Sequence, residues 1–469
     1  MRIHWHRRDL RIEDNPALAS GGADTTEPVL PVFVLDSAVL EHAGPPRVAF
    51  MLEALEALRS AYRSLDSDLL VVQGNPVETL PEIATKRDAT TVTWNRDYSG
   101  LARERDTAVR QALEDAGIDR DADHGAVLQE PGSIRTNDGD PYSVFTYFGR
   151  KWHDRPKDEP VDPPTSDDLV SIETDSSIPT LADLDIEQPT ATIPEASTTA
   201  AHDRLEAFCE ADIYRYEERR DYPADDCTSR LSAHLKWGTI GIRTVYEATE
   251  RALEAATTDA ERESVEEFQS QLAWREFYAQ VLWFNPEVVE ENYKSYEQPI
   301  EWRADPAALA AWKAGETGYP IVDAGMRQLQ AEAYMHNRVR MIVAAFLTKD
   351  LLIDWREGYE WFRQRLVDHD TANDNGGWQW AASTGTDAQP YFRIFNPMTQ
   401  GERYDPDGEY IREYVPELEG VPADVIHSWH ELDQGAREMH APEYPAPIVD
   451  HSERREQALA MFERARGEE

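Results

Sequence analysis

The chain has 469 residues, enough for two or three domains that each bury a core. Its formal net charge is -43, from 90 acidic and 47 basic residues, yet 41% of the residues are hydrophobic, which excludes an intrinsically disordered protein. We interpret the acidic excess as adaptation to high salt, in which acidic surfaces keep proteins soluble. The overall charge therefore does not exclude a local site for nucleic acid.

The sequence also bears on cellular location, metal binding and partners. No apolar run is long enough to span a bilayer, and the amino terminus has no signal-peptide pattern. Cys209 and Cys227 suit neither a disulfide framework nor a zinc site, and we interpret the pair His427 and His430, with its i,i+3 spacing, as part of a surface helix. We therefore expect a cytoplasmic, monomeric protein with no metal ion, no membrane contact and no obligate protein partner.

Residues 1–125 alternate short apolar runs with amphipathic segments. The apolar runs predict strands at 3–5, 29–35, 68–74 and 90–94, and the amphipathic segments predict helices at 47–63 and 101–116. This alternation implies a doubly wound parallel sheet, whose ligands bind beyond the carboxyl ends of the strands. The segment WHRRDLR (5–11) follows the first strand, so its arginines either meet an anion there or form ordinary surface ion pairs.

A connector and a helical region follow this α/β region. Residues 156–200 are rich in proline, serine, threonine and acids, which predicts a long surface connector with little local order. Beyond residue 201 the apolar spacing predicts helices at 205–216, 265–283, 307–314, 321–334, 338–352 and 359–367. The second large domain should therefore be all-α.

The stretch DHDTANDNGGWQWAASTGTD (368–387) is unlike an ordinary helix or strand. It contains Asp368, Asp370, Asp374, Asp387, the pair Gly376–Gly377, and two tryptophans, Trp378 and Trp380. Acids beside buried aromatic rings are costly unless they are paired or bound to a ligand. Adjacent glycines permit a close backbone approach or a positive φ. One interpretation is a helix that ends at the glycines; we favour a ligand pocket.

Two further segments carry groups suited to binding. TSRLS (228–232) has three hydroxyls and an arginine before a helical segment, which suits phosphate, or else forms a helix cap. In QLAWREFY (271–278), Gln271, Trp274 and Tyr278 share one helix face. That face could bind a flat ring by stacking and hydrogen bonding, or Trp274 could be core and Gln271 exposed.

A basic island lies at residues 334–349 (YMHNRVRMIVAAFLTK). Arg340 on this otherwise apolar segment needs a buried partner, and Asp368 or Asp370 could serve. Arg338 and His336 could meet phosphate, unless the arginines simply extend to solvent. Three tryptophans on separate segments, Trp302, Trp355 and Trp378, could form an electron-hopping path, although aromatic residues more often form core.

Six motifs together resemble the photolyase/cryptochrome family: WHRRDLR, TSRLS, QLAWREFY, TGYPIVDAGMRQL (317–329), MHNRVRM (335–341) and NGGWQWAASTGTDAQPYFRIFNP (375–397). They lie in the family's order, span essentially the whole chain, and look closest to class I cyclobutane pyrimidine dimer DNA photolyases. The resemblance implies an α/β antenna domain of Rossmann-like type (1–130), an inter-domain connector (131–200) and a helical FAD-binding catalytic domain (201–469). It also implies a halophilic source.

The function implied by the resemblance is light-driven repair of UV-damaged DNA. Excited reduced FAD (FADH⁻) would pass an electron to a cyclobutane pyrimidine dimer that has been flipped out of the duplex. A cryptochrome-type blue-light photoreceptor is the alternative, and a (6-4) photolyase is a third possibility. The latter would need two histidines in the lesion pocket, where His336 is the one obvious candidate.

The resemblance also implies roles for individual residues. The FAD phosphates and ribitol would contact Tyr216, Thr228, Ser229, Arg230, Leu231 and Ser232, and the isoalloxazine would lie against Arg340, Asp368, Asp370 and Asp374. The flipped dimer would contact Gln271, Trp274, Asn337, Met341 and Trp380. DNA phosphates would contact Arg220 and Arg338, and photoreduction would run through Trp378, Trp355 and Trp302, from inside to surface.

Two positions depart from the class I pattern. Gln271 stands where much of class I has glutamate, and its amide can bond to the dimer but cannot act as an acid, so we expect repair with altered efficiency. Asp374 stands where most class I members have an asparagine that faces flavin N5. Aspartate is similar to the plant cryptochrome pattern, in which it can protonate N5.

A second, light-harvesting chromophore is also expected from the resemblance. LKWGTIGIR (235–243) resembles a segment of deazaflavin-binding photolyases, so Lys236 and Arg8 would contact an 8-hydroxy-5-deazaflavin rather than methenyltetrahydrofolate. The alternative is that Lys236 is an ordinary residue on a helix surface.

Overall fold

A five-stranded parallel sheet forms the amino-terminal part of the molecule. The computed structural model describes residues 1–19 and 27–468. The strands are β1 (Arg2–His6), β2 (Val29–Leu35), β3 (Leu70–Gln73), β4 (Thr91–Asn95) and β5 (Asp119–Asp123), in the order β3-β2-β1-β4-β5. The predicted doubly wound α/β fold is confirmed. Strand β5 escaped prediction because its sequence, DRDAD, is polar, as suits an edge strand.

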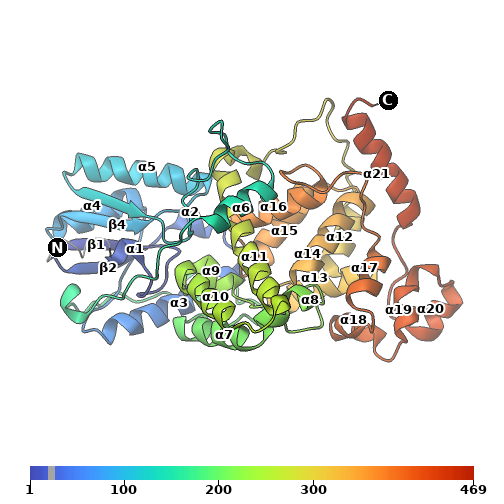
Figure 1. Cartoon of the computed structure of the whole chain (residues 1–469), viewed down its shortest axis with the longest axis horizontal. Helices are drawn as coiled ribbons and strands as arrows, with labels where there is room; N and C mark the ends of the chain where they lie inside the picture. The colour runs from blue at the N-terminus through green and yellow to red at the C-terminus, as the bar shows by residue number, and fades with distance from the viewer. Residues whose placement is uncertain (20–26, 469) are drawn as a thin grey trace.

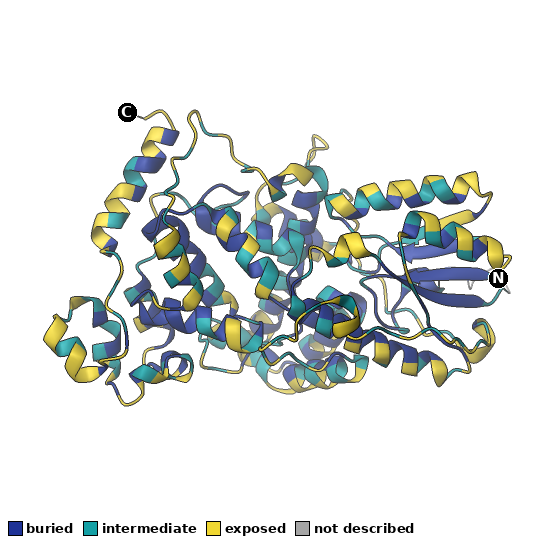
Figure 2. Ribbon diagram, turned by 180° about the vertical axis from the view of Figure 1, so that it is seen from behind, coloured by how far each residue is buried: buried dark blue, intermediate teal, exposed yellow. Residues whose placement is uncertain are grey.

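Helices cover both faces of this sheet. They are α1 (Pro16–Ala19), α2 (Ser37–Leu40), α3 (Pro45–Arg63), α4 (Pro76–Lys86) and α5 (Gly100–Asp115). Figure 1 shows α3 on one side of the sheet and α4 and α5 on the other. Each side has its own apolar core, and β1, β2 and β4 between them are almost wholly buried, whereas the edge strands β3 and β5 are partly exposed (Figure 2). Strand β2, VLPVFVL, is apolar throughout because both of its faces are covered.

The connector runs along the surface, and its proline-rich part (156–200) has little local order before α7 (Thr198–Glu210), as predicted. It contains α6 (Phe145–Asp154) and two short 3-10 turns, η1 (Ser166–Asp168) and η2 (Ala182–Leu184). One parallel bridge joins Leu169 to Val29, so the connector touches the start of β2.

The described residues from 198 onward contain helices and no strand, in agreement with the predicted all-α domain. The helices of its first half are α7 (Thr198–Glu210), η3 (Asp212–Arg215), α8 (Tyr216–Arg219), α9 (Ser232–Trp237), α10 (Ile242–Ala255), α11 (Asp259–Phe284), η4 (Pro286–Val289), α12 (Pro306–Ala314) and α13 (Pro320–Glu332). No helix in the described part of the chain is long and apolar enough to cross a bilayer.

The second half surrounds the unusual stretch at 368–387. Its helices are α14 (Asn337–Ala345), the π-helix η5 (Phe346–Asp350), α15 (Trp355–Arg365), α16 (Thr371–Ala382), α17 (Pro397–Tyr404), α18 (Glu409–Tyr414), η6 (Pro416–Leu418), α19 (Ala423–His427), η7 (Trp429–Glu431), α20 (Gln434–His440) and α21 (His451–Ala465). Two predicted helices are interrupted. The one at 205–216 breaks at Ala211, and the one at 338–352 changes to π geometry at Phe346.

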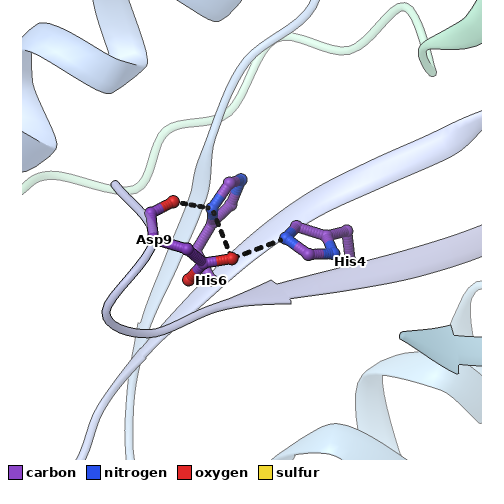
Figure 3. Close-up of side chains that lie close together, drawn as sticks. All are labelled: His4, His6 and Asp9. Carbon is purple, nitrogen blue, oxygen red and sulfur yellow. Dashed lines mark hydrogen bonds and ion pairs between the residues drawn. The ribbon is translucent and has the colours of Figure 1, made fainter. Parts of the chain in front are cut away.

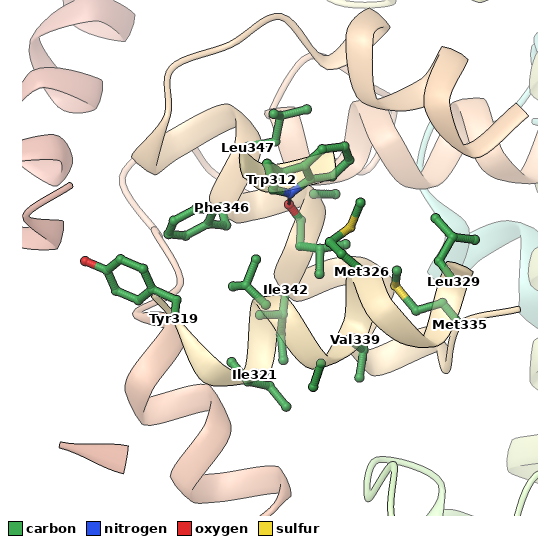
Figure 4. Packing of buried hydrophobic residues seen from close by; sticks show 14 of the residues in the cluster. Trp312, Tyr319, Ile321, Met326, Leu329, Met335, Val339, Ile342, Phe346 and Leu347 are labelled. Carbon is green, nitrogen blue, oxygen red and sulfur yellow. Dashed lines mark hydrogen bonds between the residues drawn. The ribbon is translucent and has the colours of Figure 1, made fainter. Parts of the chain in front are cut away.

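The main core of the helical domain is built around buried tryptophans. Figure 4 shows Trp312 packed among Met326, Phe346 and Leu347, with its indole N–H donating to the Val343 carbonyl oxygen at 3.1 Å. A buried indole needs such a partner, and this one joins α12 to α14. The core therefore fixes α14, which carries the basic island, against its neighbours.

A buried histidine–aspartate network stabilises the loop after β1. His4 Nε2 lies 3.2 Å from Asp9 Oδ2, and His6 Nδ1 lies 3.0 Å from the Asp9 carbonyl oxygen (Figure 3). Thr93 Oγ1 lies 3.2 Å from His4 Nδ1, and the Tyr62 hydroxyl 2.7 Å from His6 Nε2. The spacing of these groups would suit a metal ion. Every ring nitrogen nevertheless has a protein partner, so we assign the network a structural role.

This network predicts a loss of stability in weak acid. Burial lowers the pKa of His6 from 6.5 to about 3. Below pH 6.5 the unfolded chain binds a proton that folded His6 does not, so its contribution is complete above pH 6.5 and declines as the pH falls toward 3. At pH 5 the loss is about 2 kcal/mol. The measurement is the urea unfolding free energy at pH 7 and pH 5, in concentrated salt.

The matched variant is His6→Gln, which keeps a neutral polar group at the same place. Its unfolding free energy should fall by about 2 kcal/mol less than that of the parent between the two pH values. An equal fall in both proteins would show that proton uptake by His6 on unfolding is not the cause of the loss of stability.

Candidate cofactor and substrate site

Arg340 of α14 forms the centre of a buried ion-pair cluster. Its Nη2 donates to Asp368 Oδ2 at 2.8 Å, and its Nη1 lies 3.6 Å from Asp374 Oδ1. Its Nε donates to the Met335 carbonyl oxygen at 2.8 Å. Burial lowers the pKa of Arg340, but the two carboxylates outweigh this effect and raise the pKa above its usual value. The expected Arg340–Asp368 pair is present, and the arginine stays charged.

Asp374 also contacts a histidine that the sequence analysis did not select. His369 Nδ1 lies 2.6 Å from Asp374 Oδ2, and the two side chains are 3% and 10% exposed. The same oxygen accepts a hydrogen bond from the Asp370 backbone N–H at 3.2 Å. His369 lies between two of the selected acids in sequence, which could have marked it as a site residue. Adjacency in sequence does not, however, reveal which side chains meet.

Asp370 joins the helical domain to the sheet. Its Oδ1 accepts a hydrogen bond from the Asn373 backbone N–H at 3.1 Å, which caps the start of α16. Its Oδ2 accepts from Arg8 Nη2 at 2.6 Å, although Arg8 was assigned to the antenna site. Burial raises the pKa of Asp370, but Arg8, Lys236 and Arg275 overcome this effect and hold the pKa well below its usual value.

A pocket lies where the sheet meets the helical domain. Its lining includes Arg8, Asp97 and Tyr98 from the loops after β1 and β4, and Arg275 and Asp370 from the helices. The pocket therefore sits beyond the carboxyl ends of the strands, where the fold predicts a ligand.

Lys236 is half-buried close to this pocket and is not an ordinary residue on a helix surface. Burial lowers the pKa of Lys236 to about 7, with Arg8 adding to the effect and Asp370 and Asp97 opposing it. A lysine with such a pKa can bind an anion as a cation or accept a hydrogen bond as an amine.

Helix α16 corrects the interpretation of the unusual stretch. It runs without a break through Gly376 and Gly377 and ends at Ser383, whose φ is +68°. The expected close approach is nevertheless present. A Cβ on Gly376 would lie 2.1 Å from Tyr278 Cδ1 of α11, whereas a Cβ on Gly377 would meet nothing within 4 Å. Gly376 thus permits α16 to pack against α11, and it does not end the helix.

Helix α11 presents Gln271 and Trp274 on one face, as predicted. One face of Trp274 stacks on Phe145 of the connector, with ring centroids 3.8 Å apart and planes 11° from parallel. Gln271 Nε2 donates to Glu267 at 2.8 Å, and Glu267 also pairs with Arg220. The proposed lesion contacts are therefore held by neighbours from the connector and from α11 itself.

The other predicted lesion and phosphate contacts lie on nearby helices. Asn337 Nδ2 lies 3.9 Å from Met341 Sδ on α14, and Trp380 is half-buried on α16. Arg338 pairs with Asp221 at 2.6 Å and stacks over the Tyr404 ring at 4.4 Å. Because Arg220 pairs with Glu267, both arginines assigned to DNA phosphates have an acidic partner.

The TSRLS segment does not cap a helix. Leu231 precedes α9 without a side-chain cap bond. Arg230 adopts a left-handed φ of +47°, pairs with Glu332 at 3.1 Å and lies over the Tyr334 ring at 4.8 Å. Tyr216 lies at the start of α8, and the remaining residues assigned to the FAD phosphates are Thr228, Ser229 and Ser232.

The three selected tryptophans belong to one aromatic region. Trp378 and Trp355 are buried in the main core, and Trp302 is partly buried and packs against it. The Trp355 indole N–H donates to Asn292 Oδ1 at 2.9 Å, while the Trp302 ring lies 6.0 Å from that of Phe462 on α21. Trp302 is thus the member nearest the surface, as expected for the outer end of the path, while Trp378 and Trp355 are both buried.

The chain is similar in sequence to known proteins over its whole length. Residues 2–165 match the DNA photolyase family, and residues 268–464 match the FAD binding domain of DNA photolyase. A deoxyribodipyrimidine photo-lyase of Halobacterium salinarum is 65% identical over 100% of both chains.

Two solved structures resemble the whole chain. A class III photolyase from Agrobacterium tumefaciens has a TM-score of 0.90 and 37% identity, covering 99% of this chain and 98% of its own. An archaeal photolyase from Sulfolobus tokodaii, solved with two FAD molecules, has a TM-score of 0.84 and 33% identity over 99% of each chain. The chain belongs to the DNA photolyase family.

The two glycines of α16 give a matched pair of variants. Gly376→Ala should destabilise the protein by about 1–3 kcal/mol, because the new methyl group overlaps the Tyr278 ring. Gly377→Ala should stabilise it by roughly 0.5–1 kcal/mol, because alanine loses less backbone entropy within a helix. Thermal unfolding and the bound-FAD content after purification measure both effects. Equal behaviour of the two variants would contradict the close approach.

Proposed function

We propose that this member of the DNA photolyase family repairs cyclobutane pyrimidine dimers in DNA with blue light. The observation that carries the proposal is the 65% identity, over the full length of both chains, to a protein named deoxyribodipyrimidine photo-lyase. The motif residues that would perform the reaction are all present in this chain, except for the two substitutions at Gln271 and Asp374. We place the repair in the cytoplasm. We assign the antenna domain to residues 1–130, the inter-domain connector to 131–200 and the FAD-binding catalytic domain to 201–469.

The residues around Arg340 fit a bound FAD. Within the described part of the chain, Asp368 Oδ1 is buried without a hydrogen-bond partner, so it is an acceptor available to a ligand. The Arg340 guanidinium beside it would stabilise negative charge on a reduced flavin. Asp370 and Asp374 would complete this side, and Tyr216 with residues 228–232 would hold the phosphates. When bound, reduced FAD supplies on excitation the electron that splits the dimer and takes it back afterwards.

The chain's own residues would receive the flipped dimer. Trp274 has one ring face on Phe145, which leaves the other face to stack on a pyrimidine. Trp380 would lie opposite, while the amides of Gln271 and Asn337 would bond to the ring edges and Met341 would fill the remaining space. A damaged pair is easier to extrude than an intact pair because its stacking is already disturbed.

Arg220 and Arg338 would contact the DNA phosphates on either side of the lesion. Each must exchange its acidic partner, Glu267 or Asp221, for a phosphate. Binding in concentrated salt would therefore depend more on stacking than on phosphate contacts.

The pocket between sheet and helices would hold the second chromophore. Arg8 and Asp97 supply charged groups at its wall, and Lys236 lies close enough to both to affect their charges. We favour an 8-hydroxy-5-deazaflavin, whose ring oxygen is anionic and would bind Lys236. The Sulfolobus tokodaii photolyase, described with two FAD molecules, supports a second chromophore without fixing its type.

The central test is light-dependent repair of a thymine dimer in an oligonucleotide, in concentrated KCl. Trp274→Ala should weaken binding of the dimer by about 1–3 kcal/mol, because a stacking surface is lost. Affinity for undamaged single-stranded DNA and FAD content serve as controls and should change little. If the parent protein binds and photoreduces FAD yet repairs nothing in light, the cryptochrome-type signalling function is favoured instead.

The tryptophan path predicts a different phenotype. Trp378→Phe should slow photoreduction of FAD strongly, because phenylalanine is much harder to oxidise than tryptophan. Repair should persist when FAD is reduced chemically, since Trp378 does not touch the substrate. Transient absorption after a laser flash measures the first effect and the oligonucleotide assay measures the second. Loss of repair in the chemically reduced variant would place Trp378 in the repair step itself.

A further inference from the structure

Asp387 is the fourth acid of the stretch 368–387, and the proposed FAD site contains only the other three. It lies in residues 383–389, the loop that follows α16 and that we call the return loop. Asp387 adopts a left-handed φ of +45°, which aspartate tolerates better than most residues with a Cβ. A backbone conformation of this kind persists where the surrounding contacts hold it, so the contacts of Asp387 indicate its role.

The return loop begins and ends on the backbone of Trp380. The Trp380 carbonyl oxygen accepts a hydrogen bond from the Ser383 N–H at 3.3 Å and another from the Gln389 N–H at 3.1 Å. The Gln379 carbonyl oxygen accepts the Thr384 N–H at 3.0 Å. The loop is therefore fixed to the last turn of α16, which carries one of the two tryptophans proposed to clamp the lesion.

The middle of the return loop holds the amino-terminal end of α6. Asp387 Oδ2 accepts a hydrogen bond from the Phe145 backbone N–H at 3.2 Å, and the Thr386 hydroxyl donates to the Ser143 carbonyl oxygen. The residue before α6 is Val144, whose side chain cannot cap the helix. Asp387 thus supplies, from a distant segment, the acceptor that a serine at position 144 would supply locally. Its negative charge also suits the positive end of the helix.

Phe145, the residue that Asp387 bonds to, supports the other tryptophan of the clamp. Its ring stacks on Trp274 with centroids 3.8 Å apart and lies edge-on to Phe277 at 5.9 Å. These contacts fix the position of one face of Trp274. Asp387 therefore connects the helix that carries Trp380 to the ring on which Trp274 rests.

We propose that Asp387 is a positioning residue that sets the separation of Trp274 and Trp380. The proposal rests on the proposed function, in which a flipped dimer stacks between these two rings. Walls that are held at the right separation before binding lose less conformational entropy when the dimer enters. An undamaged single strand stacks on one ring at a time and gains nothing from that separation. Asp387 should therefore affect the preference for the dimer and leave the general affinity for single strands unchanged.

A purely structural role would have a different consequence. If Asp387 only stabilised α6, any local cap at the start of that helix would replace it. If Asp387 positions the clamp, a local cap restores the stability of α6 but leaves it unconnected to the helix that carries Trp380. The valine at position 144 makes this distinction testable.

Four variants separate the two roles. Asp387→Gly removes the acceptor, and glycine adopts the same positive φ without strain. Asp387→Asn keeps an acceptor oxygen and tolerates that φ. Val144→Ser/Asp387→Gly gives α6 a cap of its own while the bond to the return loop stays broken. Thr386→Val removes the hydroxyl that donates to the Ser143 carbonyl oxygen and leaves Asp387 in place.

The measurement is equilibrium binding, in the dark and in concentrated KCl, of the FAD-loaded protein to a single-stranded oligonucleotide with one thymine dimer and to the same strand undamaged. Asp387→Gly should bind the dimer about fivefold more weakly, because one cap hydrogen bond is lost, and should bind the undamaged strand as the parent does. Asp387→Asn should stay close to the parent on both strands. Val144→Ser/Asp387→Gly should regain the parental temperature of thermal unfolding but not the parental preference for the dimer.

Two results would overturn the proposal. Return of the parental preference in Val144→Ser/Asp387→Gly would show that Asp387 only stabilises α6. Equal weakening of both strands by Asp387→Gly, or no weakening of either, would show that Asp387 does not set the clamp. If Asp387→Gly retains no FAD, Thr386→Val decides by the same criteria, since it should show a smaller loss of preference for the dimer. A parent protein that binds FAD but does not prefer the dimer would instead contradict the proposed function, whichever way the variants behave.

Discussion

Acidic side chains in the loop before α16 and in its first turn need cationic partners, and these partners come from several parts of the molecule. Asp368, Asp370 and Asp374 lie within seven residues of one another, and each must have a partner because an unpaired buried charge is costly. Arg340 of α14 serves Asp368, Arg8 from the loop after β1 serves Asp370, and His369 contacts Asp374. The short acidic segment thus connects α16 to α14 and to the loop after β1, which is distant in sequence. Removing one of these cations would leave a buried carboxylate without a partner and would destabilise the fold.

The same pairing places the two proposed chromophore sites in contact. Asp370 lines the pocket between sheet and helices, and it also belongs to the group proposed to face the flavin. Arg8 bonds to Asp370 at 2.6 Å and to Asp97 at 3.3 Å, so one guanidinium spans the wall of the pocket and the flavin side. A charged ligand in the pocket that contacts Arg8 would therefore also change the electrostatic potential at the proposed flavin site. The domain interface is an electrostatic connection as well as a packed surface.

Much of this arrangement could be predicted from sequence, and the omissions have physical causes. Apolar runs revealed β1, β2 and β4, which are largely buried on both faces, and also the edge strand β3, whose sequence LVVQ is mostly apolar. The other edge strand, β5, is polar and gave no such signal. Arg340 was a lone cation on an apolar face, so its acidic partner could be named in advance. His369, by contrast, is adjacent in sequence to Asp368 and Asp370 but meets Asp374, one helical turn further on. The glycine pair indicated a close approach, which Gly376 makes and Gly377 does not, and the helix that approaches it depends on tertiary structure.

High salt divides the charges of this protein into two classes. At about 1 M salt the screening length is about 3 Å, so exposed or half-exposed pairs lose most of their strength. Arg220 with Glu267 and Arg338 with Asp221 belong to this class, and exchanging their carboxylates for phosphates costs little there. Asp368, with a side chain 1% exposed, is shielded from the salt together with its contact to Arg340. An acidic chain can thus keep a permanently charged cofactor site inside while its surface arginines remain free to change partners, which is the combination that binding DNA in brine requires.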